Sequence, residues 1–430
     1  MKVSLARALG ACCLAAALHA APTQAAEAAP PLTLRQAVDA ALAGNPELAA
    51  FAFELRAQDA RTRQAALRPP LEASLEAENV LGTGDAKGTD NAEFTFALSR
   101  VVELGGKRDA RIAAAQAGLG ALDVERQARQ LDVLAEVTRR FITLAARQEQ
   151  LRLARTGREL AEQTLTASER RVKAAKSPHV ELDRAHIALD RAQLTERRAG
   201  VDLETARKQL AALWGESQAV IAGQPFGEVR ADLFTMAPTG EFEALRARLA
   251  ASPDLLKFAS EARLRDAELR LAATLRKPDL TLGGGIRRFE GSNDQAFVAS
   301  VSLPLFSGRR AESFVAEAQA NRRRVDAGRR AAEVKATAAL FELHHQLRQA
   351  VVEADTLRDD MLPRVEEAVT EARYAYDRGR YSYLELVDAQ REYLAVQAAR
   401  IEAAADAHNL QAEIERLTSA PLTTPVPAFE

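Results

Sequence analysis

The sequence predicts a mainly α-helical protein with a small β part, organised as an internal two-fold repeat. Ala, Leu, Arg, Glu and Gln dominate its 430 residues, and these are strong helix formers. The 22 glycines and 16 prolines are too few for a sandwich of many short strands. The same order of helix start, two strand-like segments and a long helix occurs twice, at positions roughly 200 residues apart.

The N-terminus has the pattern of a secretory signal peptide over residues 1–25. Lys2 and Arg7 precede an apolar stretch, and an Ala-rich segment follows it. Cys12 and Cys13 both lie within the predicted signal peptide, so the mature chain would hold no disulfide or thiolate metal site. A lipoprotein signal acylated at Cys12 is the alternative. Cleavage removes two basic residues and no acidic one, so the net charge of −2 becomes more negative. A negative net charge does not favour nucleic-acid binding.

Each half opens with a helix that has proline at its first position. Asn45 precedes Pro46 in the first half, and Ser252 precedes Pro253 in the second. Asn and Ser commonly cap helix N-termini, and proline is favoured directly after the cap. The helices are expected over residues 46–67 and 253–276.

Two hairpins are predicted next, over residues 71–102 and 279–305. Apolar and polar residues alternate along each strand, and each strand has about ten residues, enough to cross a bilayer when tilted. Two ordinary soluble hairpins are the alternative, because such alternation is a weak signal. Acidic residues on the polar face are candidates for lining a channel lumen: Glu72, Glu76, Glu78 and Glu93.

Two long helices are predicted over residues 107–175 and 309–376. The first would extend about 100 Å at the usual rise per residue. The helices after each turn, 180–213 and 383–417, are about half as long, so one long helix can lie beside two short helices stacked end to end. Helices of this length are stabilised by lateral, coiled-coil-like packing.

The predicted division of the chain follows the repeat. It assigns 1–25 to the signal peptide, 26–218 to the first repeat, 219–240 to an equatorial linker, 241–418 to the second repeat and 419–430 to a C-terminal tail. Four strands cannot close a membrane barrel, and open sheet edges are not tolerated in lipid. The chain is therefore expected to act as an oligomer, and three copies would supply twelve strands.

The motifs of the two halves resemble those of the TolC-like outer-membrane factor family, in particular its CzcC-type heavy-metal efflux branch. The resemblance covers residues 32–419. Its motifs are LTLRQA from Leu32, NPEL from Asn45, ELGGKR from Glu103, LPLFSGRR from Leu303, and YDRG from Tyr376 leading into YLELVDAQ from Tyr383.

This resemblance implies a homotrimer in the outer membrane of a Gram-negative bacterium, with a twelve-stranded β-barrel continuous with a long periplasmic α-helical barrel. It also implies a passive exit duct that contacts outer-membrane lipid. The expected partners are a periplasmic adaptor, or membrane fusion protein, and a proton-driven inner-membrane pump of the RND type that exports divalent metal cations. No cofactor and no enzymatic activity are expected, since the sequence contains no recognisable catalytic or phosphate-binding motif.

Two other functions remain open. A channel of the same fold could serve drug efflux or type I protein secretion instead of metal efflux. A soluble periplasmic coiled-coil adaptor or scaffold is the second alternative.

The resemblance also places candidate site residues at the turn after the second long helix. Glu385 and Asp388 match the carboxylates of the family's entrance constriction, where threefold symmetry would give rings of negative charge. An ordinary solvated acidic helix face is the alternative. Tyr381 stands where some family members carry a basic gating residue, and Arg380 or Arg378 is the candidate replacement.

The turn after the first long helix carries a weaker candidate for metal contact. His179, Asp183 and His186 are spaced i, i+4, i+7, so they share one helix face and have ligand types suited to transition metals. An ordinary exposed helix face is the favoured interpretation, because a duct should not bind its cargo tightly.

Overall fold

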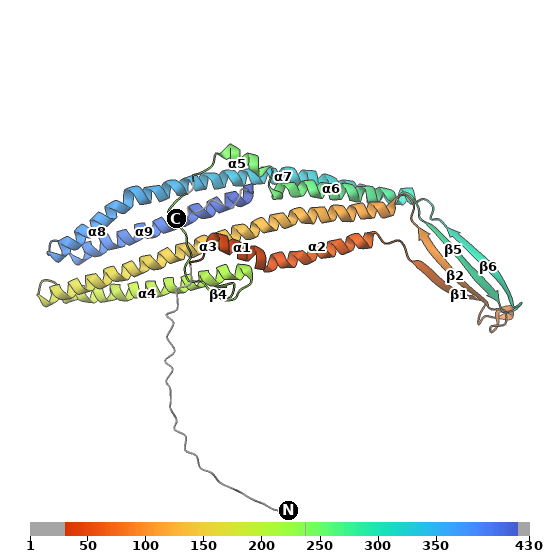
Figure 1. Ribbon diagram of the computed structural model, residues 1–430, viewed down its shortest axis with the longest axis horizontal. Coiled ribbons are helices and arrows are strands. Elements are labelled where there is room, and N and C mark those ends of the chain that lie inside the picture. The colour runs from red at the N-terminus through yellow and green to blue at the C-terminus, as the bar shows by residue number, and fades with distance from the viewer. Residues whose placement is uncertain (1–30, 237, 420–430) are drawn as a thin grey trace, which may run out of the picture.

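The computed structural model describes residues 31–236 and 238–419 as a long, curved rod of helices with a β-sheet at one end (Figure 1). The predicted signal peptide and all but the first residue of the predicted C-terminal tail lie outside the described residues. In the part of the chain that the structure describes, no helix is both long enough and apolar enough to cross a lipid bilayer.

The elements occur in the same order in both halves. The first half contains α1 (Leu34–Gly44), α2 (Pro46–Ala65), β1 (Leu71–Glu78), the 3-10 turn η1 (Gly84–Ala86), β2 (Glu93–Val102), α3 (Lys107–Lys173), α4 (His179–Ala211) and η2 (Ala212–Trp214). A small hairpin of β3 (Val220–Ile221) and β4 (Gln224–Pro225) follows. The second half contains α5 (Phe242–Leu249), α6 (Pro253–Thr274), β5 (Leu280–Phe289), β6 (Asp294–Ser302), α7 (Ser307–Thr356), η3 (Leu357–Met361), α8 (Leu362–Asp377) and α9 (Tyr383–Thr418). The predicted fold class, mainly helical with a small sheet and an internal repeat, is confirmed.

Each long helix packs beside two shorter helices. Helix α3 contacts α4 over one end of its length and α2 over the other, while α7 contacts α6 and α9 (Figure 1). The two halves pack side by side, because α3 of the first half also contacts α6 and α9 of the second half. The rod is therefore a bundle in which the sheet lies at one end and the turns between α3 and α4 and between α8 and α9 lie at the other.

The second long helix differs from the prediction of one unbroken helix. It passes from α7 through the π-helical turn η3 into α8. Pro363 is the second residue of α8, and proline lacks an N–H and crowds the carbonyl four residues earlier. The wider turn directly before it relieves this clash. Helix α3 contains no proline and remains continuous.

The two predicted helix caps behave differently. The Asn45 side-chain oxygen accepts hydrogen bonds from the N–H groups of Glu47 and Leu48, at 2.9 and 3.0 Å, so it caps α2 as expected. Its amide nitrogen donates to the Leu213 carbonyl at 2.9 Å, which joins the start of α2 to the end of the α4 segment. Ser252 occupies the N-cap position directly before Pro253, as predicted, but its side chain forms no cap hydrogen bond and its buried hydroxyl has no partner among the described residues.

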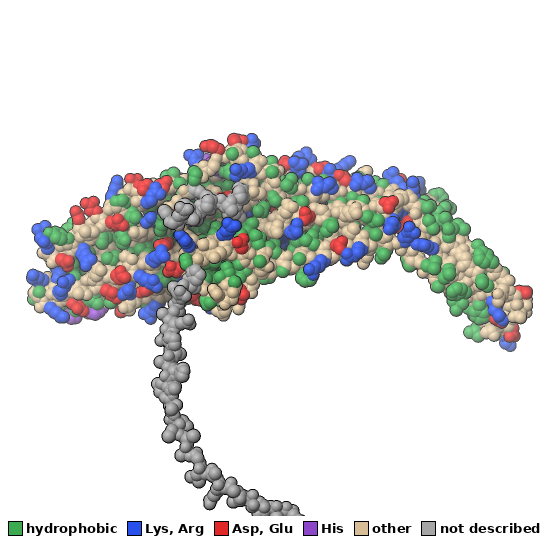
Figure 2. Space-filling model, viewed as in Figure 1, with side chains coloured by type: hydrophobic (Ala, Val, Ile, Leu, Met, Phe, Trp, Pro, Cys, Tyr) green, Lys and Arg blue, Asp and Glu red, His purple; other side chains and the backbone are tan. Residues whose placement is uncertain are grey.

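The four long strands form one antiparallel sheet in the order β1-β2-β5-β6. The hairpins join where β2 pairs with β5, from Glu93 opposite Phe289 to Val102 opposite Leu280. One face is apolar and exposed, with Leu75, Phe297 and Val301 more than two-thirds accessible, and Figure 2 shows hydrophobic side chains gathered over this end of the molecule. Within the described chain, β1 and β6 are edge strands with one partner each.

The segment between the halves is tied to the helices through its backbone. The Val229 N–H donates to the Gln148 side chain of α3 at 2.6 Å, and the Gln148 amide donates back to the Val229 carbonyl at 3.2 Å. The His408 ring of α9 hydrogen bonds the Leu233 carbonyl at 3.1 Å. Burial lowers the pKa of His408, which favours its neutral form.

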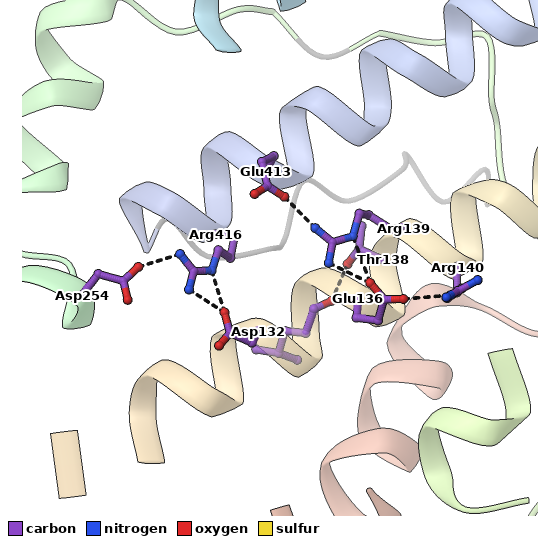
Figure 3. Close-up of polar contacts among 9 residues, drawn as sticks. Asp132, Glu136, Thr138, Arg139, Arg140, Asp254, Glu413 and Arg416 are labelled. Carbon is purple, nitrogen blue, oxygen red and sulfur yellow. Dashed lines mark hydrogen bonds and ion pairs between the residues drawn. The ribbon is translucent and has the colours of Figure 1, made fainter. Parts of the chain in front are cut away.

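An ion-pair network joins three helices where α9 ends and α6 begins (Figure 3). Arg416, in the last turn of α9, pairs with Asp132 of α3 and with Asp254 of α6, at 2.5 Å in each case. Burial alone would lower the pKa of Arg416, but its hydrogen bonds and the two carboxylate charges outweigh burial and raise it. The basic group lies at a helix C-terminus and Asp254 at a helix N-terminus, so both also interact favourably with the helix dipoles.

Replacing Arg416 with Gln should destabilise the rod, because it leaves Asp132 and Asp254 without their shared cation. The expected loss is about 1–3 kcal/mol of unfolding free energy, since the network is partly buried. Arg63→Gln is the matched control. Among the described residues Arg63 pairs only with Asp59, on an exposed turn of α2, so its loss should cost below about 0.5 kcal/mol. Denaturant unfolding followed by circular dichroism measures both, and equal losses would contradict a special role for Arg416.

Candidate functional site

The two interhelical turns lie together at the end of the rod that is farthest from the sheet, and we call this region the tip (Figure 1). Ala175, after α3, and Gly379, after α8, both adopt the left-handed backbone conformation, with φ of 55° and 75°. These two residues occupy corresponding places in the repeat, so the same turn geometry is used twice. Gly379 adopts it without cost, whereas Ala175 is strained.

The predicted constriction carboxylates both lie exposed on the first turns of α9. Glu385 forms a capping box with Ser382, whose backbone N–H donates to the Glu385 carboxylate at 2.6 Å. That hydrogen bond lowers the pKa of Glu385, so the group carries a full negative charge near neutral pH. Asp388 lies one turn further and forms an exposed ion pair with Arg391, at 3.3 Å. The arrangement therefore presents two charged carboxylates to solvent on one helix, and Glu385 also stabilises the helix start.

The candidate gate residues do not form a latch within one chain. Tyr381 is exposed. The Arg378 guanidinium lies over the Tyr374 ring, 4.2 Å from its centroid, and in the described residues no ion pair joins Arg378 or Arg380 to a carboxylate. A salt-bridge gate built from these arginines is thus not formed in this structure.

A buried contact between the two turns was missed by the sequence analysis. Tyr376 of α8 is fully buried, and its hydroxyl lies 3.0 Å from the Ser168 hydroxyl of α3. Arg171 of α3 donates to the Tyr376 carbonyl at 2.6 Å and stacks over its ring at 4.4 Å. Burial raises the pKa of Tyr376. A compositional signal was available, because all five tyrosines of the chain lie between residues 374 and 393.

A further carboxylate, Glu181 of α4, faces this buried contact. It corresponds in the repeat to Glu385, but Pro178 stands where the second half has Ser382. Proline has no N–H to donate, so Glu181 cannot form a capping box like the one in which the Glu385 carboxylate takes part. One of its carboxylate oxygens is buried and has no hydrogen-bond partner among the described residues. Its charge adds to the effect of burial in raising the pKa of Tyr376.

The predicted histidine contact for metal is not formed as a three-residue site. His179 pairs with Asp183 at 3.5 Å, and both side chains are exposed. His186 does not join them, and among residues 31–236 and 238–419 no group of three His, Cys, Asp or Glu side chains is placed to hold a metal ion. The reason is geometric, because residues seven apart lie about 10 Å apart along a helix.

The four strand acids share the polar face of the sheet. Glu72 lies opposite Ser99, Glu76 opposite Thr95 and Glu78 opposite Glu93, while the alternate residues lie on the apolar face. Glu78 and Glu93 are each paired with Arg287, at 2.8 Å. The face is therefore less uniformly acidic than the sequence suggested.

Tyr376→Phe should loosen the tip, because it leaves the fully buried Ser168 hydroxyl without its partner. A loss of about 1 kcal/mol is expected, which corresponds to roughly fivefold faster amide exchange in residues 372–390. Tyr374→Phe is the matched control, since Tyr374 is exposed and should leave exchange unchanged. Equal amide exchange in the two variants would show that the hydrogen bond between Tyr376 and Ser168 does not stabilise the tip.

Comparisons with known proteins agree with this architecture. The family model for outer membrane efflux proteins matches residues 37–216 and 244–420, one block for each repeat. The cobalt-zinc-cadmium resistance protein CzcC of Cupriavidus metallidurans is 29% identical over 367 residues, which covers 85% of this chain and 84% of that protein. The nickel and cobalt resistance protein CnrC of the same organism is 30% identical over 339 residues, 76% of each chain.

The fold also matches a solved structure. The CmeC outer membrane channel of Campylobacter jejuni superposes with a TM-score of 0.71 at 17% identity, over 90% of this chain and 85% of that one. Channels of this family are passive conduits that lie in the outer membrane and extend into the periplasm, so this protein is an outer-membrane channel component and not an enzyme. With its two repeats matched in order, the chain belongs to the outer membrane efflux protein family.

Proposed function

We propose that three copies of this chain form the outer-membrane exit duct of a tripartite efflux system for divalent heavy-metal cations. The observation that carries this proposal is the similarity over most of both chains to proteins named for resistance to cobalt, zinc and cadmium, and to nickel and cobalt. The exposed carboxylates of Glu385 and Asp388 at the tip support a cationic substrate.

The surface of α4 supports assembly with further copies. Val180, Ile187, Leu194 and Val201 recur every seven residues along α4, and each is about half exposed or more. A stripe of this kind is the seam of a coiled coil, which lacks a partner within one chain. We call these four residues the α4 stripe and infer that it packs against the neighbouring copy. Three four-stranded sheets then supply twelve strands, enough for a closed barrel.

The partners follow from the passive nature of the duct. A conduit supplies no energy, so the driving force must come from an inner-membrane pump of the RND type. A periplasmic adaptor, or membrane fusion protein, would connect that pump to the tip, which is the end of the rod farthest from the sheet.

The tip carboxylates are proposed to form the cation-selective entrance. In a trimer Glu385 and Asp388 would each occur three times around one axis, which raises the local cation concentration and repels anions. We propose that Tyr381, with Arg378 or Arg380, limits passage there.

Deletion of the gene should lower tolerance to cobalt, zinc or cadmium, and the wild-type gene should restore it. The double variant Glu385→Gln with Asp388→Asn should restore it only partly, to a tolerated concentration about two- to fourfold below wild type, because the charge rings are lost. Gln can still cap α9, so the fold is retained. Asp183→Asn, an exposed acid on the other tip helix, is the control and should restore tolerance fully.

A deletion that leaves metal tolerance unchanged but sensitises cells to drugs would contradict the metal assignment and favour the drug-efflux alternative. Full restoration by the double variant would contradict the role of the carboxylates while leaving the exit duct in place.

A further inference from the structure

A three-strand ionic cluster lies on the polar face of the sheet, at the end that carries the hairpin loops. Arg287 of β5 pairs with Glu78 of β1 and with Glu93 of β2, at 2.8 Å in each case. Its Nε donates to the Thr95 hydroxyl at 2.9 Å. The Asn79 amide donates to the other oxygen of Glu93 at 3.1 Å. We call Arg287, Glu78, Glu93 and Asn79 the exit cluster.

Arg287 is the single basic residue among the strand residues of this face. The register places five acidic residues on the same face of the four strands: Glu72, Glu76, Glu78, Glu93 and Asp294. The neighbouring Arg288 lies on the opposite face, where it pairs with Glu290. The exit cluster is thus the one place on the polar face where a fixed positive charge meets the carboxylates.

The neighbouring positions of β5 on the polar face leave space beside the Arg287 side chain. The preceding residues of β5 on this face are Gly283 and Gly285, which carry no side chain. A Cβ at Gly285 would collide with the Phe96 carbonyl, and one at Gly283 with the Ser300 hydroxyl. The glycines therefore keep β5 close to its neighbours, and Arg287 is the first long side chain on the way to the loops.

Without Arg287 the remaining groups would suit a divalent cation. Glu78 and Glu93 lie directly opposite each other in the β1–β2 register, so their carboxylates face one another. The Asn79 amide N–H donates to Glu93 and helps to hold that carboxylate in place. Carboxylate oxygens are ligands that divalent cations bind in proteins. The guanidinium occupies the position between the carboxylates that such a cation would take.

We propose that Arg287 is a specificity-determining residue that acts as a tethered cation and prevents the duct from retaining divalent metal ions at its outer end. The inference rests on the proposed function, since only a duct for such cations needs this protection. Glu72 and Glu76, nearer the helices, can attract cations along the face, and the exit cluster then lets them leave. One cation against two carboxylates leaves one net negative charge per chain, so the exit remains attractive to cations without offering a vacant binding site.

Two measurements on the purified, detergent-solubilised protein test this role. Calorimetric titration with cobalt chloride should show at least about tenfold tighter binding for Arg287→Gln than for wild type, because two opposed carboxylates become free. In planar bilayers, cobalt added on the side of the hairpin loops should block monovalent current in this variant at a correspondingly lower concentration. Arg287→Lys keeps one charge and should show a smaller gain, so it decides the matter if the Gln variant does not fold.

Two control variants separate this effect from a structural one. Arg288→Gln removes the adjacent arginine from the other face and should behave as wild type. Glu78→Gln with Glu93→Gln and Arg287→Gln removes the freed carboxylates and should return cobalt binding to the wild-type level.

The proposal is overturned if Arg287→Gln and Arg287→Lys bind cobalt no more tightly than wild type, or if the triple variant binds as strongly as Arg287→Gln. These outcomes are independent of the duct itself. Gained cobalt binding in a protein that inserts no pores would support the role of Arg287 and contradict the proposed function.

Discussion

The unpaired backbone of two edge strands is the constraint on which the rest of this structure depends. Within the described chain β1 and β6 each have one partner, so each presents a row of N–H and C=O groups without a strand beside it. In hydrocarbon each such group costs several kcal/mol if unsatisfied. Since the outer face of the sheet is apolar, the sheet must complete its hydrogen bonding with other sheets. In the proposed trimer, β6 of one chain pairs with β1 of the next, and the helices below must follow the same symmetry.

The duplication supplies two similar halves, and a few substitutions give them different roles. Asn45 caps α2 and ties it to the end of the α4 segment, whereas the Ser252 side chain makes neither contact and the corresponding junction is held by Arg416. Pro178 frees Glu181 from the capping role that Ser382 gives to Glu385. The junction at Asn45 is therefore uncharged, whereas the junction at Ser252 is ionic. At the tip, the Glu181 carboxylate points inward and the Glu385 carboxylate points toward solvent.

Much of the fold follows from local patterns in the sequence. Proline after Asn45 marks the start of α2, alternation marks the strands, and the lack of proline marks the length of α3. The π-helical turn before Pro363 was not predicted, because the repeat indicates a second long helix as continuous as α3. Glu385 and Asp388 are exposed, which agrees both with a constriction and with an ordinary solvated helix face, so their role in selectivity stays a prediction.

Contacts between distant segments could not be predicted in the same way. Arg287 and Glu93 are far apart in the sequence, and only the pairing of β2 with β5 brings them together. Tyr376 and Ser168 come from different halves, and their contact depends on how α3 packs against α8. His179 and His186 share a helix face, but residues seven apart lie too far apart along a helix to reach one ion, and no three-residue metal group is present among the described residues.

The number of copies in the native particle tests the central claim most directly. The mass of the detergent-extracted protein, measured by native mass spectrometry, should correspond to three chains, the number in the proposed twelve-stranded trimer. Ile187→Asp with Leu194→Asp places charge in the α4 stripe and should shift the particle toward single chains, while Glu196→Gln on the same helix should leave it trimeric. A wild-type protein that is monomeric, or a trimer unaffected by charge in the stripe, would contradict the account.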